Sequence, residues 1–228
     1  MDIAEQKQIQ EHFERMYQFG QKPWTEHRPE PSLGKFFEIL RTSRLAKFTL
    51  SPIEGLARRV KVSIPAKILD IGCGNGWISI KAAKAGFEVW GIDSSETAIE
   101  EAIETAKDEG IEGNTDFQVG DALNLPYDES FFDALIDRGL FHHILPENRI
   151  AYFDNILRVL RSESLIYISV FSDKNPVGIG QLFTKELMEE LFGKNFTSIY
   201  YKEDPYPSDS PAHLLHFIFE RKLRGRTS

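Results

Sequence analysis

The chain has 228 residues, of which 41% are hydrophobic and 27% are charged, and its formal net charge is −8 at pH 7. This length suits one substantial α/β domain, and the composition is that of a folded globular protein rather than a disordered one. The acidic balance argues against a nucleic-acid partner, and no run reaches the roughly 20 apolar residues of a membrane helix. The single cysteine, Cys73, excludes an intrachain disulfide, and with the polar N-terminus it predicts a cytoplasmic protein.

Residues 1–60 are expected to form N-terminal helices and a lid segment of the same domain, whose core then occupies residues 61–228. Apolar side chains recur every three to four residues over 3–18 and over 33–48, which predicts two helices. Three prolines interrupt the stretch between them and exclude regular structure there. Trp24 lies among these prolines and is interpreted either as a hydrophobic anchor on the domain or as part of a flap over a ligand.

The stretch Lys67–Trp77 is the centre of the predicted fold. Apolar residues surround Asp70, three glycines follow at alternate positions, and a helical pattern begins at Trp77. A strand that breaks into glycine and continues as a helix is typical of an open α/β sheet, which binds ligands at the carboxyl ends of its strands. Glycine allows a positive φ and a close approach of ligand to backbone. The residues expected to form this cofactor-binding turn are Asp70, Gly72, Cys73, Gly74 and Gly76.

Two features of the sequence bear on which ligand binds at this turn. The dinucleotide fingerprint G-x-G-x-x-G requires glycine where this chain has Trp77. The next predicted strand, residues 88–92, is followed by Asp93, and a carboxylate at that position can accept two hydrogen bonds from ribose hydroxyls. Ser94 or Ser95 is expected to cap the following helix, and Ser94 is included in the predicted cofactor site because it adjoins Asp93.

The remaining pattern completes a sheet. The run 132–136 is almost wholly apolar, which is typical of a central parallel strand, and it continues into Asp137-Arg138-Gly139. Strands that alternate with helices and finish in a hairpin predict an α/β, Rossmann-like, doubly wound fold. Its seven-stranded, mostly parallel sheet has an antiparallel edge strand and an N-terminal helical cover. The other strands are expected at 115–119, 164–170, 196–202 and 213–221.

The chain resembles the class I S-adenosylmethionine-dependent methyltransferases in the turn from Asp70 to Gly76 and in the position of Asp93. The string Asp-Arg-Gly-Leu-Phe-His-His, which begins at Asp137, is similar to the segment after the fourth strand of the thiopurine, thiol, halide and tellurite methyltransferases, especially their bacterial branch. The segment around Trp24 is similar to one that closes over the cofactor in the thiopurine and thiol enzymes. One departure is Arg161-Ser162-Glu163-Ser164, where such enzymes usually have Lys-Pro-Gly-Gly.

The resemblance implies S-adenosyl-L-methionine as the cofactor, with S-adenosyl-L-homocysteine as its product. It also implies that an acidic residue at Asp121, next to Ala122, lies beside the adenine and accepts from its exocyclic amine. From the residues alone, Asp121 can equally cap the turn that follows the third core strand. Asp137, at the end of the fourth core strand, is placed to contact the cofactor.

Arg138 and His142 are the candidate catalytic residues. Arg138 either stabilises an anionic nucleophile through bidentate donors or belongs to a surface ion pair of little consequence. His142 either lines the methyl-transfer site as a base or hydrogen-bond donor, or is a structural histidine. No cysteine or histidine stands at ligand spacing from His142 and His143, so no metal is expected.

Together these observations predict an enzyme that transfers a methyl group from S-adenosylmethionine to a small-molecule nucleophile. A thiol or another soft acceptor is the first candidate for that nucleophile. The alternatives are a small-molecule O- or N-methyltransferase and a non-catalytic partner subunit that keeps the fold. A nicotinamide oxidoreductase is a more distant possibility because Trp77 breaks its fingerprint. The expected partner is a small molecule, with neither nucleic acid nor membrane, and the protein is expected to be a monomer or homodimer.

Overall fold

The computed structural model describes residues 2–21, 30–49, 65–176, 180–205 and 213–223 of the chain. Trp24 and the predicted boundary between residues 60 and 61 lie outside the described residues. The helices are α1 (Asp2–Gln18), α2 (Pro31–Thr49), α3 (Trp77–Lys84), α4 (Glu96–Asp108), α5 (Arg149–Val159) and α6 (Lys185–Gly193). The strands are β1 (Lys67–Ile71), β2 (Glu88–Asp93), β3 (Thr115–Val119), β4 (Phe132–Arg138), β5 (Leu160–Phe171), β6 (Phe196–Pro205) and β7 (His213–Arg221).

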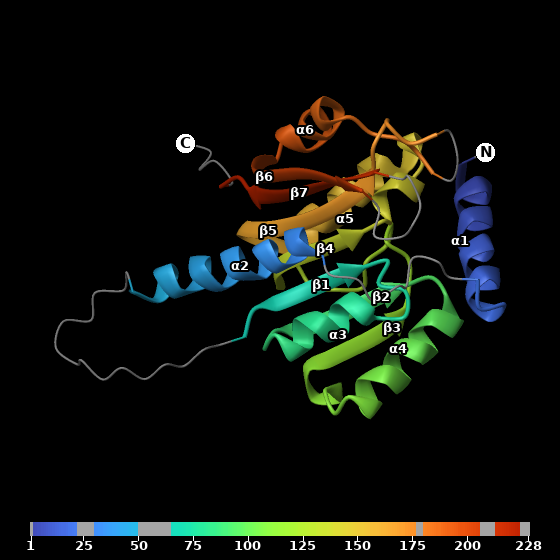
Figure 1. Cartoon of the computed structure of the whole chain (residues 1–228), viewed down its shortest axis with the longest axis horizontal. Helices are drawn as coiled ribbons and strands as arrows, with labels where there is room; N and C mark the ends of the chain where they lie inside the picture. The colour runs from blue at the N-terminus through green and yellow to red at the C-terminus, as the bar shows by residue number, and fades with distance from the viewer. Residues whose placement is uncertain (1, 22–29, 50–64, 177–179, 206–212, 224–228) are drawn as a thin grey trace.

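The strands form one seven-stranded sheet in the order β3-β2-β1-β4-β5-β7-β6 (Figure 1). The first five strands are parallel to one another, whereas β7 is antiparallel to both β5 and β6. The order reverses between β1 and β4, and this switch point is where open α/β sheets bind their ligands. The predicted doubly wound fold is confirmed.

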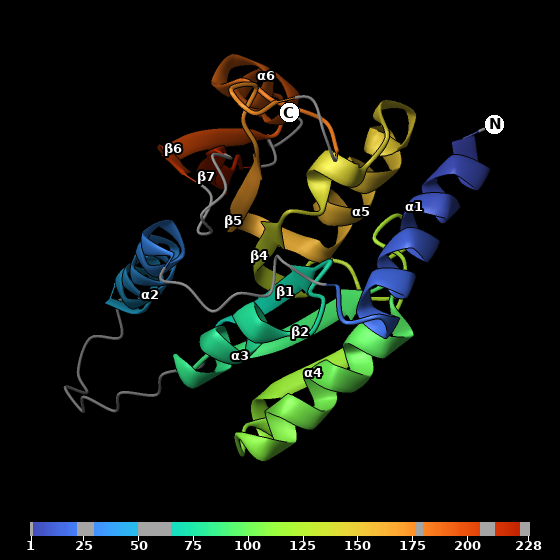
Figure 2. The same ribbon diagram turned by 45° about the vertical axis from the view of Figure 1, so that its right-hand side comes forward.

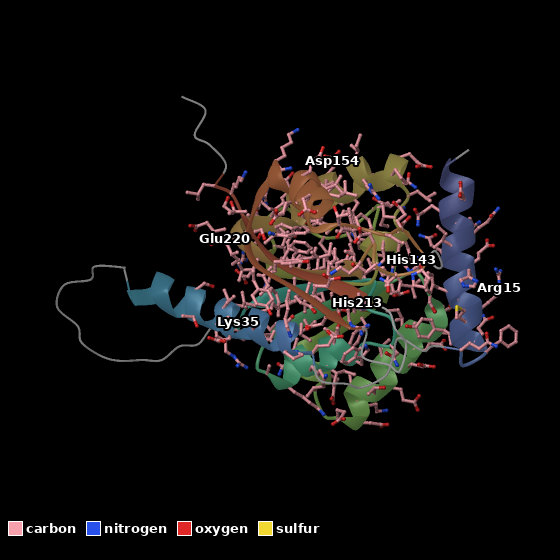
Figure 3. The ribbon with its side chains drawn as sticks, turned by 45° about the horizontal axis from the view of Figure 1, so that its top comes forward. Arg15, Lys35, His143, Asp154, His213 and Glu220 are labelled. Atoms are coloured by element: carbon pink, nitrogen blue, oxygen red, sulfur yellow. The ribbon has the colours of Figure 1, made fainter. Side chains whose placement is uncertain are left out.

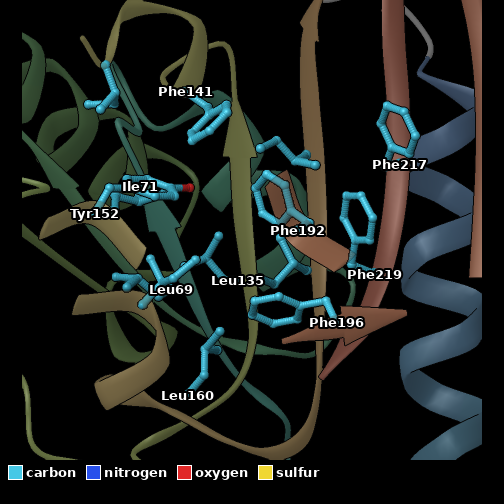
Figure 4. Close-up of a cluster of buried hydrophobic side chains, with 14 of the residues drawn as sticks. Leu69, Ile71, Leu135, Phe141, Tyr152, Leu160, Phe192, Phe196, Phe217 and Phe219 are labelled. Carbon is cyan, nitrogen blue, oxygen red and sulfur yellow. The ribbon is translucent and has the colours of Figure 1, made fainter. Parts of the chain in front are cut away.

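Side chains of β1 alternate between the two faces of the sheet, as the two-residue period of a strand requires. Ile68 packs with α2 and α3 on one face, while Leu69 and Ile71 pack with α5 on the other. Figure 2 shows α4 beside α3, on the side of the sheet opposite α5. Figure 4 shows the second face, where Phe141, Tyr152 and the aromatic side chains of α6, β6 and β7 form a continuous core. This core fixes the positions of the strand ends that carry the polar residues.

Helix α1 lies across the end of the sheet at which the parallel strands finish (Figures 1 and 2). It packs against α4, and its inner face supplies Tyr17, which is buried. The described helices include none long and apolar enough to cross a membrane.

Several boundaries of strands and helices differ from the sequence prediction. Strand β4 continues through Asp137 and Arg138, because Arg138 stays in register with Ser169 of β5. Strand β5 begins at Leu160, which pairs with Phe132 across an irregularity in the ladder, so the segment that departs from the family pattern belongs to the strand. Pro146 begins a short 3-10 turn, and α5 starts only at Arg149.

Candidate cofactor and acceptor site

A cavity of about 410 Å³ lies between α1 and the carboxyl ends of the parallel strands. This volume is within the usual range of small-molecule sites. Its walls come from the inner face of α1, the glycine turn after β1, and the residues that follow β2, β3, β4 and β5. We call the part lined by the ends of β1, β2 and β3 the cofactor end, and the part lined by the ends of β4 and β5 the acceptor end.

The glycine turn forms one wall of the cofactor end, and its conformation requires glycine. Gly72 and Gly74 have φ values of +69° and +53°. A Cβ at Gly72 would lie 2.9 Å from Cβ of Leu140, and a Cβ at Gly74 would overlap the hydroxyl of Tyr17. Gly76 adopts the left-handed conformation at the N-cap of α3 and does not line the cavity. Cys73 lines it, as predicted, but is buried.

Asp93 connects the glycine turn to the start of α4. Its Oδ2 accepts a hydrogen bond from the Gly74 amide at 2.8 Å, and its Oδ1 accepts from the Ser95 amide at 2.9 Å. Ser95 is the cap of α4, since its hydroxyl accepts from the Ala98 amide, which leaves Ser94 to line the cavity. Each Asp93 oxygen can accept a further hydrogen bond, as recognition of a ribose requires.

Asp121 fits both interpretations that the sequence left open. Its Oδ1 accepts from the Leu123 amide at 2.9 Å, so it caps the turn after β3. Asp121 and Ala122 also line the cofactor end. A carboxylate that caps its own turn is held at a fixed angle, so the structural role supports a binding role.

Asp70 lies behind the glycine turn and is 2% exposed. The Ser79 hydroxyl of α3 donates to its Oδ2 at 2.6 Å. Burial raises the pKa of Asp70 to about 7, and the nearby carboxylates of Asp137 and Asp93 add to the shift. Asp70 therefore changes its charge close to neutral pH.

Asp137 does not line the cavity, so the expectation that it contacts the cofactor directly is not supported. Its Oδ1 accepts from the amides of Leu140 at 3.0 Å and Phe141 at 3.1 Å, and its Oδ2 accepts from the Tyr152 hydroxyl at 2.7 Å. The fully buried Asp137 carboxylate accepts all three hydrogen bonds and thereby holds the turn after β4 in place. Asp137 positions this wall of the cavity from behind.

Arg138 lines the cavity and forms a buried ion pair with Glu30, in which Nε lies 2.5 Å from Oε1. The two side chains are 10% and 3% exposed, so the interpretation as a surface pair is wrong. The guanidinium also lies over the ring of Trp77, 5.0 Å from its centroid. Glu30 immediately precedes α2 and comes from outside the core segment, and no local pattern predicts its contact with Arg138.

His142 and His143 belong to the short 3-10 turn Phe141–His143 at the acceptor end. His142 is 4% exposed, and its Nδ1 has no hydrogen-bond partner in the described part of the chain. Burial lowers the pKa of His142 well below its ordinary value and that of His143 to about 4, so both rings are neutral at physiological pH. The described residues contain no cluster of three potential metal ligands.

Helix α1 is attached to the rest of the site by side-chain hydrogen bonds near both of its ends. Near its start, Gln6 donates to the His143 carbonyl at 3.1 Å and accepts from the Leu145 amide at 3.1 Å. Near its end, Glu14 accepts from the hydroxyls of Ser95 at 2.6 Å and Thr97 at 2.7 Å. Figure 3 shows His143 at the end of the molecule beside α1. The sequence predicted this helix and an N-terminal helical cover, but not the side chains that attach the helix to the site.

The cofactor end fits the S-adenosylmethionine that the resemblance implies. Asp70, Asp93 and Asp121 line the cavity, while Arg138, already paired with Glu30, is the only arginine or lysine among the described lining residues. This balance suits a positively charged sulfonium and disfavours the diphosphate of a dinucleotide. The buried Oδ1 of Asn75 also lacks a partner in the described residues, which leaves an acceptor for a polar ligand.

Comparison with known proteins agrees with this fit. A family model described as a methyltransferase domain matches residues 68–163. The chain is 33% identical over 108 residues to an uncharacterized methyltransferase of Schizosaccharomyces pombe, a match that spans 47% of this chain and 73% of that protein. It is 33% identical over 112 residues to norajmaline N-methyltransferase of Rauvolfia serpentina, spanning 49% of this chain but 38% of that enzyme.

A third relative is EEF1A lysine methyltransferase 2 of Danio rerio, which is 32% identical over 154 residues, or 64% of this chain and 60% of that protein. Among solved structures, a 1,6-didemethyltoxoflavin-N1-methyltransferase from Burkholderia thailandensis, crystallised with S-adenosylhomocysteine, has a TM-score of 0.76 and 23% identity. That likeness covers 98% of this chain and 91% of the other, and it shows the shared fold. The chain therefore belongs to the methyltransferases, a family of enzymes, and has the fold of that solved structure.

Proposed function

We propose that this protein transfers a methyl group to a small-molecule nucleophile, with a thiol or another soft atom as the first candidate acceptor. The observation that supports this most directly is the cavity itself, in which a carboxylate-rich cofactor end and an apolar acceptor end share one space beneath α1. Helix α1 covers that space and is tied down near both ends, which favours an acceptor that fits beneath it.

At the cofactor end, Asp93 and Ser94 are proposed to bind the ribose, and Asp121 with Ala122 the adenine. The backbone of Gly72, Cys73 and Gly74, with Asp70 behind it, would face the remainder of the cofactor, while Gly76 sets the start of α3. When bound, S-adenosylmethionine supplies a methyl group on a positively charged sulfur. Of the two interpretations of Trp24, which lies outside the described residues, we propose that it forms part of a cover over this end.

At the acceptor end, the chain's own task is to orient the nucleophile and exclude water. Orientation alone contributes about 7–11 kcal/mol to such reactions. His142 is a poor base because burial lowers its pKa, so we assign it a hydrogen-bonding role rather than proton removal. Arg138, whose charge is already balanced by Glu30, is assigned to shape and orient this wall.

We further propose that this chain belongs to the thiopurine, thiol and tellurite methyltransferase group. This proposal is supported by the Asp137-Arg138-Gly139 segment and by the segment around Trp24. A small-molecule N- or O-methyltransferase is the alternative, and the norajmaline relative favours N-methylation by its name. The relative named for lysine methylation makes a protein side chain a further candidate acceptor.

Two experiments test the proposal. Calorimetry with S-adenosylmethionine, S-adenosylhomocysteine and NAD should show binding of the first two alone, and binding of NAD alone would refute it. A screen with labelled methyl groups over thiols, phenols, amines, halides and chalcogen oxyanions, with a lysine peptide as an additional arm, should label a small acceptor. Cofactor binding without transfer to any acceptor would favour the non-catalytic partner subunit.

A further inference from the structure

The acceptor end contains two buried polar atoms that the folded chain leaves without hydrogen bonds. They are Nδ1 of His142 and Oγ of Ser169, neither of which has a partner among the described residues. The side chains are 4% and 1% exposed, and both residues line the cavity. Buried polar atoms without partners are rare in native proteins and are costly, so a pair of them in one wall points to a ligand that completes their hydrogen bonds.

The backbone around this pair is rigid. Ser169 is in register with Arg138 of β4 and with His216 of β7, so it lies inside the sheet. Its carbonyl accepts from the Gly139 amide at 3.0 Å, which ties it to the turn that carries His142. Both polar atoms are therefore presented by fixed elements, which is the arrangement that a specific binding site requires.

The charges at the acceptor end are already balanced. Glu30 neutralises Arg138, and both His142 and His143 are neutral at physiological pH. His12, the remaining histidine of the lining, is exposed to solvent. An anionic ligand that binds here would lose its hydration and would find no unpaired positive charge to interact with. Its binding is therefore unfavourable.

Aromatic side chains form much of the remaining surface. The ring of Phe171 lies 4.3 Å from that of His142, and the ring of Phe13 lies 4.7 Å from that of His143. Leu140 and Leu214 add apolar contacts to the same wall. Aromatic walls with a few placed polar atoms are typical of sites for flat organic molecules.

Building on the proposed function, we propose that the methyl acceptor is an uncharged aromatic molecule that enters with its proton on the nucleophilic atom. His142 Nδ1 and Ser169 Oγ determine this specificity by hydrogen bonding to its S–H, O–H or N–H group. When that atom takes the methyl group from the sulfonium it becomes strongly acidic, and its proton is then lost to solvent water. Halides, chalcogen oxyanions and aromatic carboxylates are excluded as acceptors by the same wall.

The test uses the full chain loaded with S-adenosylhomocysteine and three probes of one shape: para-hydroxybenzamide, para-hydroxybenzoate and para-methoxybenzamide. Calorimetry should show that the neutral hydroxy amide binds on the order of a hundredfold more tightly than the carboxylate, which buries an unpaired charge. It should also bind about tenfold more tightly than the methoxy compound, whose ether oxygen cannot donate a hydrogen bond as the phenol does. Equal or tighter binding of the carboxylate, or no binding of the hydroxy amide up to its solubility, overturns the proposal.

Three variants locate the effect. Ser169→Ala and His142→Phe should each weaken the hydroxy amide about two- to tenfold while leaving the methoxy compound unchanged. Ser164→Ala is the matched control, because the Ser164 hydroxyl is also buried and without a partner in the described residues but does not line the cavity. An unchanged preference for the hydroxy amide in both Ser169→Ala and His142→Phe overturns the assignment.

Binding of S-adenosylhomocysteine, measured first, separates this inference from the proposed function. If the product of the cofactor does not bind, the proposed function fails. If it binds and the acceptor end prefers the anionic probe, the proposed function stands and the inference about the acceptor falls.

Discussion

Glu30 and Arg138, separated by 108 residues in the chain, meet in a buried ion pair at the acceptor end, with Oε1 2.5 Å from Nε. Glu30 also accepts a hydrogen bond from the Tyr167 hydroxyl at 3.4 Å, and Tyr167 lies 2.9 Å from Nδ1 of His216. The pair thus connects the segment before α2 with β4, β5 and β7. It makes the wall of the acceptor end depend on a residue from outside the core segment that carries Arg138.

Removing one partner of this pair should be worse than removing both. Glu30→Gln and Arg138→Met each leave a buried charge without its partner and should each lower the free energy of unfolding by about 3–5 kcal/mol. The double variant should lose less than the sum of the two. Urea unfolding measures all three, and Glu38→Gln, which breaks an exposed pair with Lys35, should cost under about 1 kcal/mol. Additive losses would contradict a coupled pair.

A second Arg138 variant tests the place of this residue in the reaction. We expect Arg138→Ala to lower turnover much more than affinity for S-adenosylhomocysteine, because Arg138 lines the acceptor end rather than the glycine turn. Turnover assays and calorimetry on the same preparation give the two quantities. Unchanged turnover on the true acceptor would remove Arg138 from the mechanism.

Gly74→Ala should weaken cofactor binding, since its φ is positive and the new Cβ overlaps the Tyr17 hydroxyl. Gly86→Ala is a matched control, because Gly86 also has a positive φ but no atom within 4 Å of a Cβ. Each variant should lose about 1–2 kcal/mol of stability through backbone strain. Only Gly74→Ala should lose cofactor affinity by calorimetry, and Tyr17→Phe in that background should restore part of it. Equal affinity losses at both glycines would show that strain alone is responsible.

Asp70 should make binding of the charged cofactor dependent on pH. Its pKa is about 7 in the free protein, so it is protonated below that pH and negatively charged above it. Affinity for cationic S-adenosylmethionine, relative to neutral S-adenosylhomocysteine, should therefore rise as the pH increases from 6 to 8, by up to about tenfold. Asp70→Asn, which keeps an acceptor for Ser79, should abolish the rise. A pH-dependent ratio that persists in this variant would assign the effect to another carboxylate.

Helix α1 should loosen when its side-chain hydrogen bonds are removed. Gln6→Ala and Glu14→Ala should increase amide hydrogen exchange across α1 and speed dissociation of S-adenosylhomocysteine, because these residues hold the helix near its two ends. Glu11→Ala is the control, since Glu11 is exposed on the same helix and does not line the cavity. Exchange rates and stopped-flow dissociation rates that match the Glu11 variant would argue against this attachment.

Local patterns in the sequence were enough to predict the sheet and the cofactor end. The glycines after Asp70 signal a left-handed turn directly, and Asp93 follows an apolar run whose length and period define a strand. Both therefore lie where the sequence placed them, at neighbouring strand ends. The role of Asp137 was not visible in the same way, because it depends on Tyr152 of a later helix.

The cover and the acceptor end depend on contacts between distant segments. Gln6 meets the Leu145 amide 139 residues away, and Glu14 meets Thr97 83 residues away. No periodicity within α1 marks these two polar residues as different from its solvent-exposed ones. The neutral state of His142 likewise follows from burial by its tertiary neighbours, which composition and spacing do not reveal.

Strand β7 is the last strand in chain order among the described residues, yet it lies between β5 and β6 and pairs with both. During synthesis, β6 therefore has no neighbour to join until residues 213–221 have left the ribosome. A nascent chain stalled before that point would expose an unpaired sheet edge at β5 and a loose β6, and would be prone to aggregation. Completion of this sheet consequently depends on β7, even though the ligand-binding turn is translated much earlier.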